Sequence, residues 1–268
     1  MDKVTASDWH PSKRVERGNA AEQIFDDLRE GILGGKLPRG TKLPTEKRLA
    51  DSYGVSSATI REAVRGLTVA RLIEVRHGSG AYVTANTDQL IAFSLRSVIQ
   101  LERIGAPHVL GVLFALISYA AEFAATQATE SDISAIQASL KRIQQGTEVE
   151  VISSGVSGFI EAIANASRNP LLVALSRLLA KIQIGLVAEL ADGSVESWHA
   201  TAGAMQRHRL RILEAIKKRN PEAARKAARS YQERAIEIFT AQPNASGATI
   251  PNPILALLIS SAQERRDE

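Results

Sequence analysis

Cysteine is absent from the 268-residue sequence. Its absence excludes disulfides, thiolate metal ligands and cysteine nucleophiles, and it is consistent with a reducing compartment. An apolar leader is also absent, because residues 1–18 are polar and charged. The most apolar run, residues 109–121, ends at Glu122 and is shorter than the ~20 residues that a membrane span needs. We therefore expect a cytoplasmic protein without a membrane segment.

Positive charge is only slightly in excess, with a formal net charge of +4. The excess is uneven, because residues 1–85 carry 14 Lys and Arg against 11 Asp and Glu, whereas the remaining residues carry 19 against 18. We therefore expect any contact with a polyanion in the first third of the chain.

The first part of the chain predicts three helices followed by a β-hairpin. The glycine pair 34–35 ends the first helix, Thr45 and Ser56 are suitable N-caps for the next two, and Gly54 is a suitable C-cap. The buried face of the third helix is expected to consist of Ile60, Ala63, Val64 and Leu67, which follow the spacing i, i+3, i+4, i+7. Residues 73–83 alternate apolar and polar side chains around a glycine-rich turn, which predicts two short strands.

No strand signal returns after this hairpin. Helices are expected at residues 88–104, 107–127, 129–146, 149–166, 169–191, 195–218 and 221–241. Seven helices with short connections are typical of an all-α antiparallel bundle. We therefore expect a mainly α chain of five parts: a mobile arm at 1–18, a small domain at 19–84, a linker at 85–89, a helical domain at 90–242 and a C-terminal extension at 243–268.

Three helices and a hairpin are the layout of a winged helix-turn-helix. The exposed face of its third helix would carry Ala58, Arg61, Glu62 and Arg65. Arg61 is suited to a bidentate contact with guanine, and the backbone N–H groups at the start of the helix suit a phosphate. The alternative is an ordinary solvated face in which Glu62 pairs with the two arginines. The preceding helix, the short turn and the wing favour the interpretation as a DNA-reading helix.

The turn of the hairpin offers a second contact. Gly78 allows close approach of the backbone, and Arg76 and His77 are placed to reach the minor groove or its phosphates. The alternative is that His77 is a plain turn residue.

Residues 34–83 resemble the DNA-binding domain of the GntR family of bacterial transcription regulators. The resemblance rests on "GGKLPRGTKLPTEKRLADSYGVSSATIREAVRGL" followed by the Gly-x-Gly wing of "RHGSGAYV". It implies DNA contacts from these positions: Lys47 or Arg48 in the second helix, Ser56, Ser57, Thr59 and Arg61 in the third, and His77 and Gly78 in the wing. Family members usually have Arg where this chain has Ser57, so one base contact is expected to be lost.

The helical remainder resembles the effector domain of the FadR-like branch of this family, through "AAEFAATQATESDISAI", "GFIEAIANASRNPLL" and "RILEAIKKRNPEAARKAA". Most relatives hold a metal there with one Asp and three His, and the metal binds a small carboxylate. The corresponding positions are Val156, Ile160, Arg209 and Tyr231 in this chain. Since Val and Ile offer no lone pair, we expect no metal and no cofactor.

Two further polar positions of the family pocket correspond to Leu113 and Ile117. The expected pocket is therefore lined by Leu113, Ile117, Val156, Ile160, Arg209 and Tyr231. With Arg209 as its only cation, it would suit a largely apolar effector with one anionic group, such as a fatty acyl, aromatic or terpenoid acid. The alternative is that these residues close the pocket and the domain only dimerises.

The resemblance implies a regulator, with repression the more common outcome in the family, that binds a palindromic double-stranded DNA operator as a homodimer. Three other interpretations are weaker. A hydrolase is disfavoured because "HGSGA" has Ala81 where a nucleophile elbow needs Gly and lies in a hairpin. A mixed α/β effector domain is disfavoured by the missing strand signal. A helical scaffold that binds no DNA remains as the third.

Overall fold

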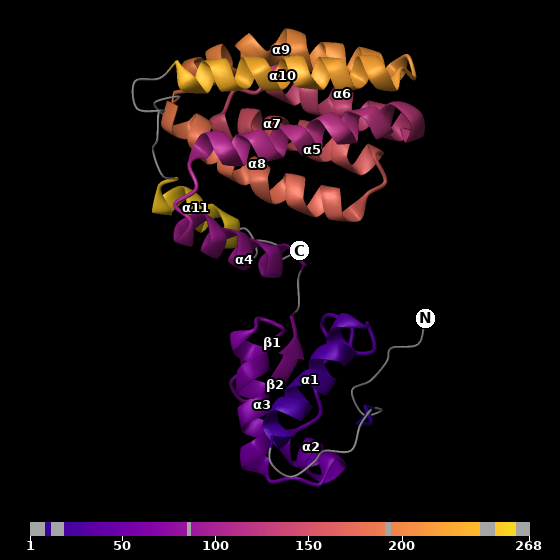
Figure 1. The fold of residues 1–268 in the computed structure, drawn as a ribbon, viewed down its shortest axis with the longest axis vertical. Helices are drawn as coiled ribbons and strands as arrows, with labels where there is room; N and C mark the ends of the chain where they lie inside the picture. The colour runs from indigo at the N-terminus through magenta and orange to yellow at the C-terminus, as the bar shows by residue number, and fades with distance from the viewer. Residues whose placement is uncertain (1–8, 12–18, 85–86, 191–193, 242–249, 261–268) are drawn as a thin grey trace. The chain divides into compact units, whose positions relative to one another are not determined.

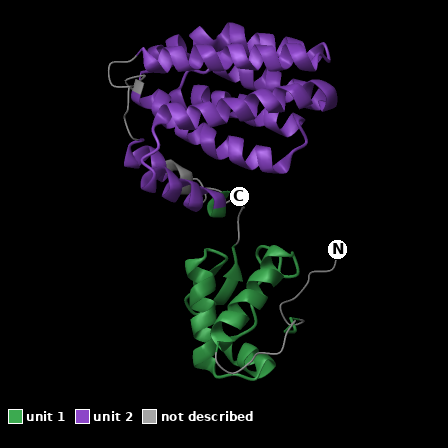
Figure 2. Ribbon diagram, viewed as in Figure 1, with its two compact units in different colours: residues 1–90 green, residues 91–268 purple. Residues whose placement is uncertain are grey.

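The computed structural model describes residues 9–11, 19–84, 87–190, 194–241 and 250–260. It divides into two compact units, residues 1–90 and residues 91–268 (Figure 2). The described residues form eleven helices and one two-stranded hairpin, which confirms the predicted mainly α class. Residues 85 and 86 of the expected linker lie outside the described residues.

The first unit contains α1, α2, α3 and the hairpin, and it ends within the first turn of α4 (Figure 1). Its elements are α1 (Ala20–Leu33), α2 (Glu46–Tyr53), α3 (Ser57–Val69), β1 (Ile73–Arg76) and β2 (Gly80–Val83). The predicted caps are confirmed. The hydroxyl of Thr45 accepts a hydrogen bond from the Arg48 N–H at 3.3 Å, and that of Ser56 accepts one from the Thr59 N–H at 3.2 Å. Gly54 ends α2 in the left-handed conformation, with φ 67°, which Gly adopts without steric cost.

The core of this unit lies between α1 and α3. All four residues predicted for the buried face of α3 are buried, and they share one cluster with the α1 residues Ile24 and Leu28. In the hairpin, Ile73 pairs with Val83 and both are buried, whereas Val75 pairs with Ala81 nearer the turn and is exposed. The alternating pattern predicted the strands correctly, but only the pair farther from the turn is covered by the helices.

Trp9 extends this core beyond the family-like segment. Its indole N–H donates to the Tyr53 hydroxyl at 3.1 Å, and that hydroxyl donates to Asp27 Oδ2 at 2.8 Å. Burial, followed by the hydrogen bond to Asp27, raises the pKa of the Tyr53 phenol above its usual range. A Cβ on Gly31 would lie 2.4 Å from the indole ring, so only Gly leaves room for it. Residues 1–8 and 12–18 of the predicted arm lie outside the described part of the chain.

The second unit is a bundle whose breaks follow the sequence prediction closely (Figure 1). Its helices are α4 (Thr87–Leu101), α5 (Ala106–Gln127), α6 (Glu130–Gln145), α7 (Val149–Ala166), α8 (Pro170–Leu190), α9 (Val195–Lys217), α10 (Pro221–Thr240) and α11 (Asn252–Ser260). Helix α5 contacts α7, α8, α9 and α10. The last helix belongs to the predicted C-terminal extension and packs against α8, with Ile254 and Leu255 buried. The side chains of residues 257–260 lie outside the described part of the chain.

Two helices of the bundle, Ala106–Gln127 and Pro170–Glu189, are long and apolar enough to cross a membrane by length and composition alone. The apolar run at residues 109–121 is therefore only part of α5, and the whole helix is longer than that run. At least half of the most apolar window of each helix is buried inside the bundle, so the apolar character of both is accounted for by the core.

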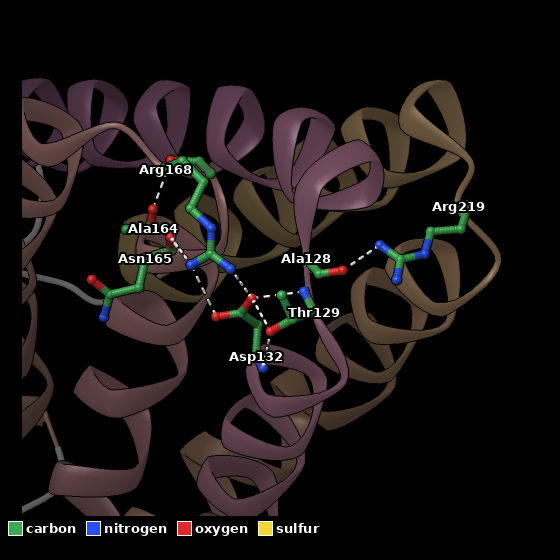
Figure 3. Close-up of polar contacts among 8 residues, drawn as sticks. Ala128, Thr129, Asp132, Ala164, Asn165, Arg168 and Arg219 are labelled. Carbon is green, nitrogen blue, oxygen red and sulfur yellow. Dashed lines mark hydrogen bonds and ion pairs between the residues drawn. The ribbon is translucent and has the colours of Figure 1, made fainter.

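Two arginines fix the turn between α5 and α6 (Figure 3). Thr129 and Asp132 form a capping box at the start of α6, and Arg168 from the end of α7 pairs with Asp132. Arg219, from the end of α9, donates to the Ala128 carbonyl at 2.5 Å. Burial alone would raise the pKa of Asp132, but the hydrogen bonds from Thr129 and the Arg168 guanidinium outweigh it, and the pKa lies below its usual range.

We predict that Gly31→Ala destabilises the first unit by about 1–3 kcal/mol, because the new methyl group displaces the Trp9 indole from a packed core. Thermal unfolding followed by Trp9 fluorescence in a Trp198→Phe background measures this. Gly203→Ala is the matched control, because nothing lies within 4 Å of its added Cβ. Equal stability of the two variants would contradict the docking of Trp9.

We predict that Asp132→Asn lowers the unfolding free energy at neutral pH by about 1 kcal/mol, the usual value of a capping contact. Because the folded pKa of Asp132 is depressed, its contribution is present above the unfolded pKa of ~4 and is lost as the pH falls through the folded pKa. Urea titrations across pH should therefore show the two proteins converging at acid pH. A constant difference would exclude the charge of Asp132 as its origin.

Candidate DNA-binding surface and effector cavity

The start of α3 presents small hydroxyl residues to solvent. Ser56 and Ser57 are exposed, and the hydroxyls of Ser56 and Thr59 lie 2.9 Å apart. The first N–H groups of a helix lack partners within the helix and carry the positive end of its dipole. This end of α3 therefore has both the open backbone and the charge that a phosphate requires.

Arg61 lies on the exposed face of α3, together with Ala58, Glu62 and Arg65. Its side chain is 65% exposed, and its Nε lies 3.7 Å from the Glu46 carboxylate of α2. The partner is therefore Glu46, where the alternative interpretation expected Glu62. An exposed pair of this kind contributes little free energy, so the guanidinium can leave it for a base at small cost.

The other predicted DNA contacts are also exposed. Lys47 and Arg48 lie on α2, and His77 and Gly78 lie in the turn of the wing. Gly78 has φ 70°, the left-handed conformation that the hairpin turn requires.

Sequence reasoning missed the role of Tyr82 in the wing. The guanidinium of Arg76 lies 4.7 Å from the centre of its ring and the ammonium of Lys42 lies 5.8 Å from it. The Tyr82 hydroxyl is 2.8 Å from that of Ser79. Lys42 reaches the wing because its backbone forms a bridge with Tyr82, an isolated pairing that no local pattern predicts. The aromatic ring therefore holds two cations beside the turn that carries His77.

A cavity of about 50 Å³ lies in the helical unit among α5, α7, α8, α9 and α10. Apolar side chains form most of its lining: Leu110, Phe114, Val156, Leu186, Val187, Ala202, Met205, Ala235, Ile238 and Phe239. Its polar lining comprises Gln183, Trp198, Thr201, Arg209 and Tyr231.

Three of the six predicted pocket residues, Val156, Arg209 and Tyr231, line this cavity. The other three, Leu113, Ile117 and Ile160, are buried in the bundle core and do not line it. On α5 the wall is formed by Leu110 and Phe114, because successive helical residues point about 100° apart and a shift of one position turns a side chain away.

Sequence reasoning also missed Gln183 and Trp198. Trp198 lies on the same face of α9 as Arg209, with Ala202 and Met205 between them at helical spacing. The sequence could have indicated this part of the lining, because the apolar stripe ends at a single arginine. Gln183 is a polar residue among apolar ones on α8, and this pattern indicates a lining residue less strongly.

Four buried polar atoms of the cavity lining have no hydrogen-bond partner among the described residues. They are Arg209 Nε, Tyr231 Oη, Trp198 Nε1 and Gln183 Oε1. The four residues are only 2%, 1%, 1% and 7% exposed, respectively. Buried polar atoms are rarely left unpaired in native proteins, so a site that gathers four of them requires bound water or a ligand.

Arg209 is also a buried charge. Its Nη1 donates to the Ala202 carbonyl at 2.8 Å, and its guanidinium lies 5.7 Å from the centre of the Tyr231 ring. Within the described part of the chain no carboxylate forms an ion pair with it. A buried guanidinium without a counter-charge carries an uncompensated desolvation cost, which an anionic ligand would offset.

Two histidines of α9 have separate hydrogen-bond partners. His199 Nε2 lies 2.8 Å from the Gly146 carbonyl, and His208 Nδ1 lies 3.1 Å from the Ser230 hydroxyl. Burial, then the arginines around it, lowers the pKa of His208. The described residues contain no group of three His, Cys, Asp or Glu side chains that could hold a metal ion. The expectation of a metal-free site continues to rest on the chemistry of the four family positions.

Comparisons with known proteins agree with both units. Residues 20–83 match the model of bacterial regulatory proteins of the gntR family, and residues 109–234 match the FCD domain. The Uxu operon regulator of Haemophilus influenzae is 30% identical over 82% of this chain and 83% of its own length. The galactonate operon transcriptional repressor of Escherichia coli is 27% identical over 78% of this chain and 92% of its own. Among solved structures, a GntR protein of Streptococcus agalactiae aligns with a TM-score of 0.60 and 24% identity over 81% of this chain and 99% of its own.

The chain therefore belongs to the gntR family of bacterial regulatory proteins. It is a ligand-responsive DNA-binding transcription regulator with an FCD effector domain, and it is not an enzyme.

We predict that Arg209→Met stabilises the ligand-free protein, by on the order of 1–3 kcal/mol, because an apolar side chain of similar length removes a buried unpaired charge. Thermal unfolding by circular dichroism at low salt measures the change. Arg207→Met is the matched control, since Arg207 lies on the same helix and is exposed. A large loss of stability confined to Arg209→Met would show that the charge has a partner in the folded chain.

Proposed function

We propose that the chain acts as a homodimeric repressor that binds a palindromic operator and changes its DNA affinity when an acidic effector enters the cavity. The observation that carries the DNA-binding part is the exposed start of α3, where Arg61 lies one turn from backbone N–H groups that have no partner within the helix; that of Thr59 is capped by the Ser56 hydroxyl. Ser56, Ser57, Thr59 and Arg65 would contact DNA from the same helix, Lys47 or Arg48 from α2, and His77 and Gly78 from the wing.

Dimerisation is supported by an exposed apolar stripe on α5. Val112, Ala115 and Tyr119 follow each other at helical spacing and are all exposed. The Tyr119 ring stacks on Phe123 with centroids 4.5 Å apart. A second copy of the same stripe would cover this surface with a two-fold symmetric contact, and two-fold symmetry is what a palindromic operator requires.

Repression is inferred from one relative, the galactonate operon protein, whose name describes it as a repressor. A cytoplasmic location is inferred from the same relationship, since a regulator must share a compartment with its DNA. The linker predicted at residues 85–89, of which residues 87–89 form the start of α4, would transmit the effector signal between the units. An effector changes DNA affinity only if it binds one dimer geometry better than another.

The effector is inferred to be an apolar acid whose anionic group binds Arg209. The apolar lining supports the body of such a ligand, and the unpaired guanidinium supports the charge. A cavity of about 50 Å³ favours a compact acid over a long fatty acyl chain, since drug-sized ligands occupy pockets of about 300 Å³ or more. A domain that is permanently closed and only dimerises would show no response to any acid.

A mobility-shift titration on the DNA upstream of the gene tests the DNA-binding proposal. Arg61→Ala is expected to weaken binding by about 5- to 150-fold, which corresponds to the 1–3 kcal/mol of a bidentate base contact. Arg29→Ala is the control, because Arg29 lies on α1, away from the predicted contacts, and its half-exposed side chain contacts only Asp26 and the Phe25 ring of the same helix among the described residues. It should leave the affinity unchanged.

Analytical ultracentrifugation of the same three proteins separates loss of DNA contact from loss of assembly, since all should sediment as dimers. Wild-type protein that fails to shift the DNA, or an Arg61→Ala variant that binds as well as Arg29→Ala, would support the scaffold interpretation instead.

A further inference from the structure

The unpaired atoms of the cavity specify more about the ligand than its charge. We infer that the cavity selects a compact hydroxy acid: one carboxylate, one hydroxyl close to it, and a hydrocarbon body. This inference rests on the proposed effector function and names the chemical class of the effector.

The carboxylate position is defined by Arg209 and Tyr231. The hydrogen bond from Arg209 to the Ala202 carbonyl shows that its side chain reaches back two turns along α9. Its Nε remains a free donor there, and the Tyr231 hydroxyl, from the ring that lies beside the guanidinium, is a second donor. Two donors beside a positive charge match the two oxygens of a carboxylate.

The hydroxyl position is defined by Trp198 and Gln183. Trp198 and Gln183 line the same cavity, the first from α9 and the second from α8. Trp198 Nε1 can only donate a hydrogen bond, and Gln183 Oε1 can only accept one. A carboxylate could satisfy the first atom but not the second. A hydroxyl accepts from the indole and donates to the amide, and it therefore satisfies both.

The remaining lining limits how polar the ligand can be. Beyond these four groups the cavity is apolar except for Thr201, so further hydroxyls would lie against Leu110, Phe114 or Val156 without partners. A polyhydroxy acid would therefore lose hydrogen bonds to water that the site cannot replace. The chain should for this reason reject galactonate, although a relative is named for the galactonate operon.

The test is a comparison of matched ligands by isothermal titration calorimetry on the full-length protein with EDTA present. 2-Hydroxy-3-methylbutanoate is expected to bind at least tenfold more tightly than 3-methylbutanoate, which lacks only the hydroxyl. The methyl ester of the hydroxy acid, which lacks the charge, and galactonate should not bind measurably.

Three variants assign the contacts. Gln183→Met should abolish the preference for the hydroxy acid, so that the two acids bind this variant with equal affinity. Tyr231→Phe should weaken both acids by the same factor, and Arg209→Met should eliminate both. Thermal unfolding of each variant without ligand confirms that it is folded.

The results distinguish the hydroxy-acid inference from the broader proposal of an acidic effector. Equal affinities of the two acids, or a preference that survives Gln183→Met, would overturn the hydroxy-acid inference while leaving an acidic effector in place. Binding of neither acid, with the operator shift intact, would mean that buried water satisfies the four atoms, and both the inference and the acidic effector would fall. Binding of small dicarboxylates only after Zn²⁺ is added would overturn the metal-free site itself.

Discussion

The burial of α5 is the constraint on which the helical unit depends. Most of this helix is apolar, and it is covered by α7, α8, α9 and α10. Helices α7, α9 and α10 each turn an apolar face toward this common centre, whereas α8 is itself apolar over most of its length. The cavity lies beside the same helix, where Phe114 meets Tyr231 edge to face with ring centres 5.7 Å apart. Helix α5 therefore forms both the centre of the core and one wall of the cavity.

The site combines an apolar enclosure with polar groups that the fold leaves unpaired. Arg209 lies at one of the positions where the family resemblance leads us to expect a metal ligand, and it would supply the positive charge that the proposed acidic effector needs. This charge would make the proposed site independent of metal supply. It also carries a desolvation cost, because the guanidinium is buried and no carboxylate pairs with it among the described residues.

Much of the fold could be predicted because its signals are local. Caps such as Thr45, Ser56 and Gly54 act through neighbouring backbone groups, and helix breaks at glycine and Asn-Pro pairs act within a few residues. The positions of Arg209 and Tyr231 were also accessible, because the family motifs are continuous in sequence. Gln183, Trp198 and Lys42 were missed because each acts through partners from distant elements. The assignment of Leu113 where Phe114 lines the cavity shows how a one-residue shift changes the face of a helix.

Because Trp9 packs into its core, the folded DNA-binding unit begins before the segment that matches the family. The family match begins at residue 20, yet the core that it describes is completed by an indole eleven residues earlier. A fragment cut at the family boundary would expose the slot above Gly31 and leave the Tyr53 hydroxyl without its donor. Such a fragment would present new apolar surface to solvent, so an isolated domain intended for crystallisation or spectroscopy should retain the segment that contains Trp9.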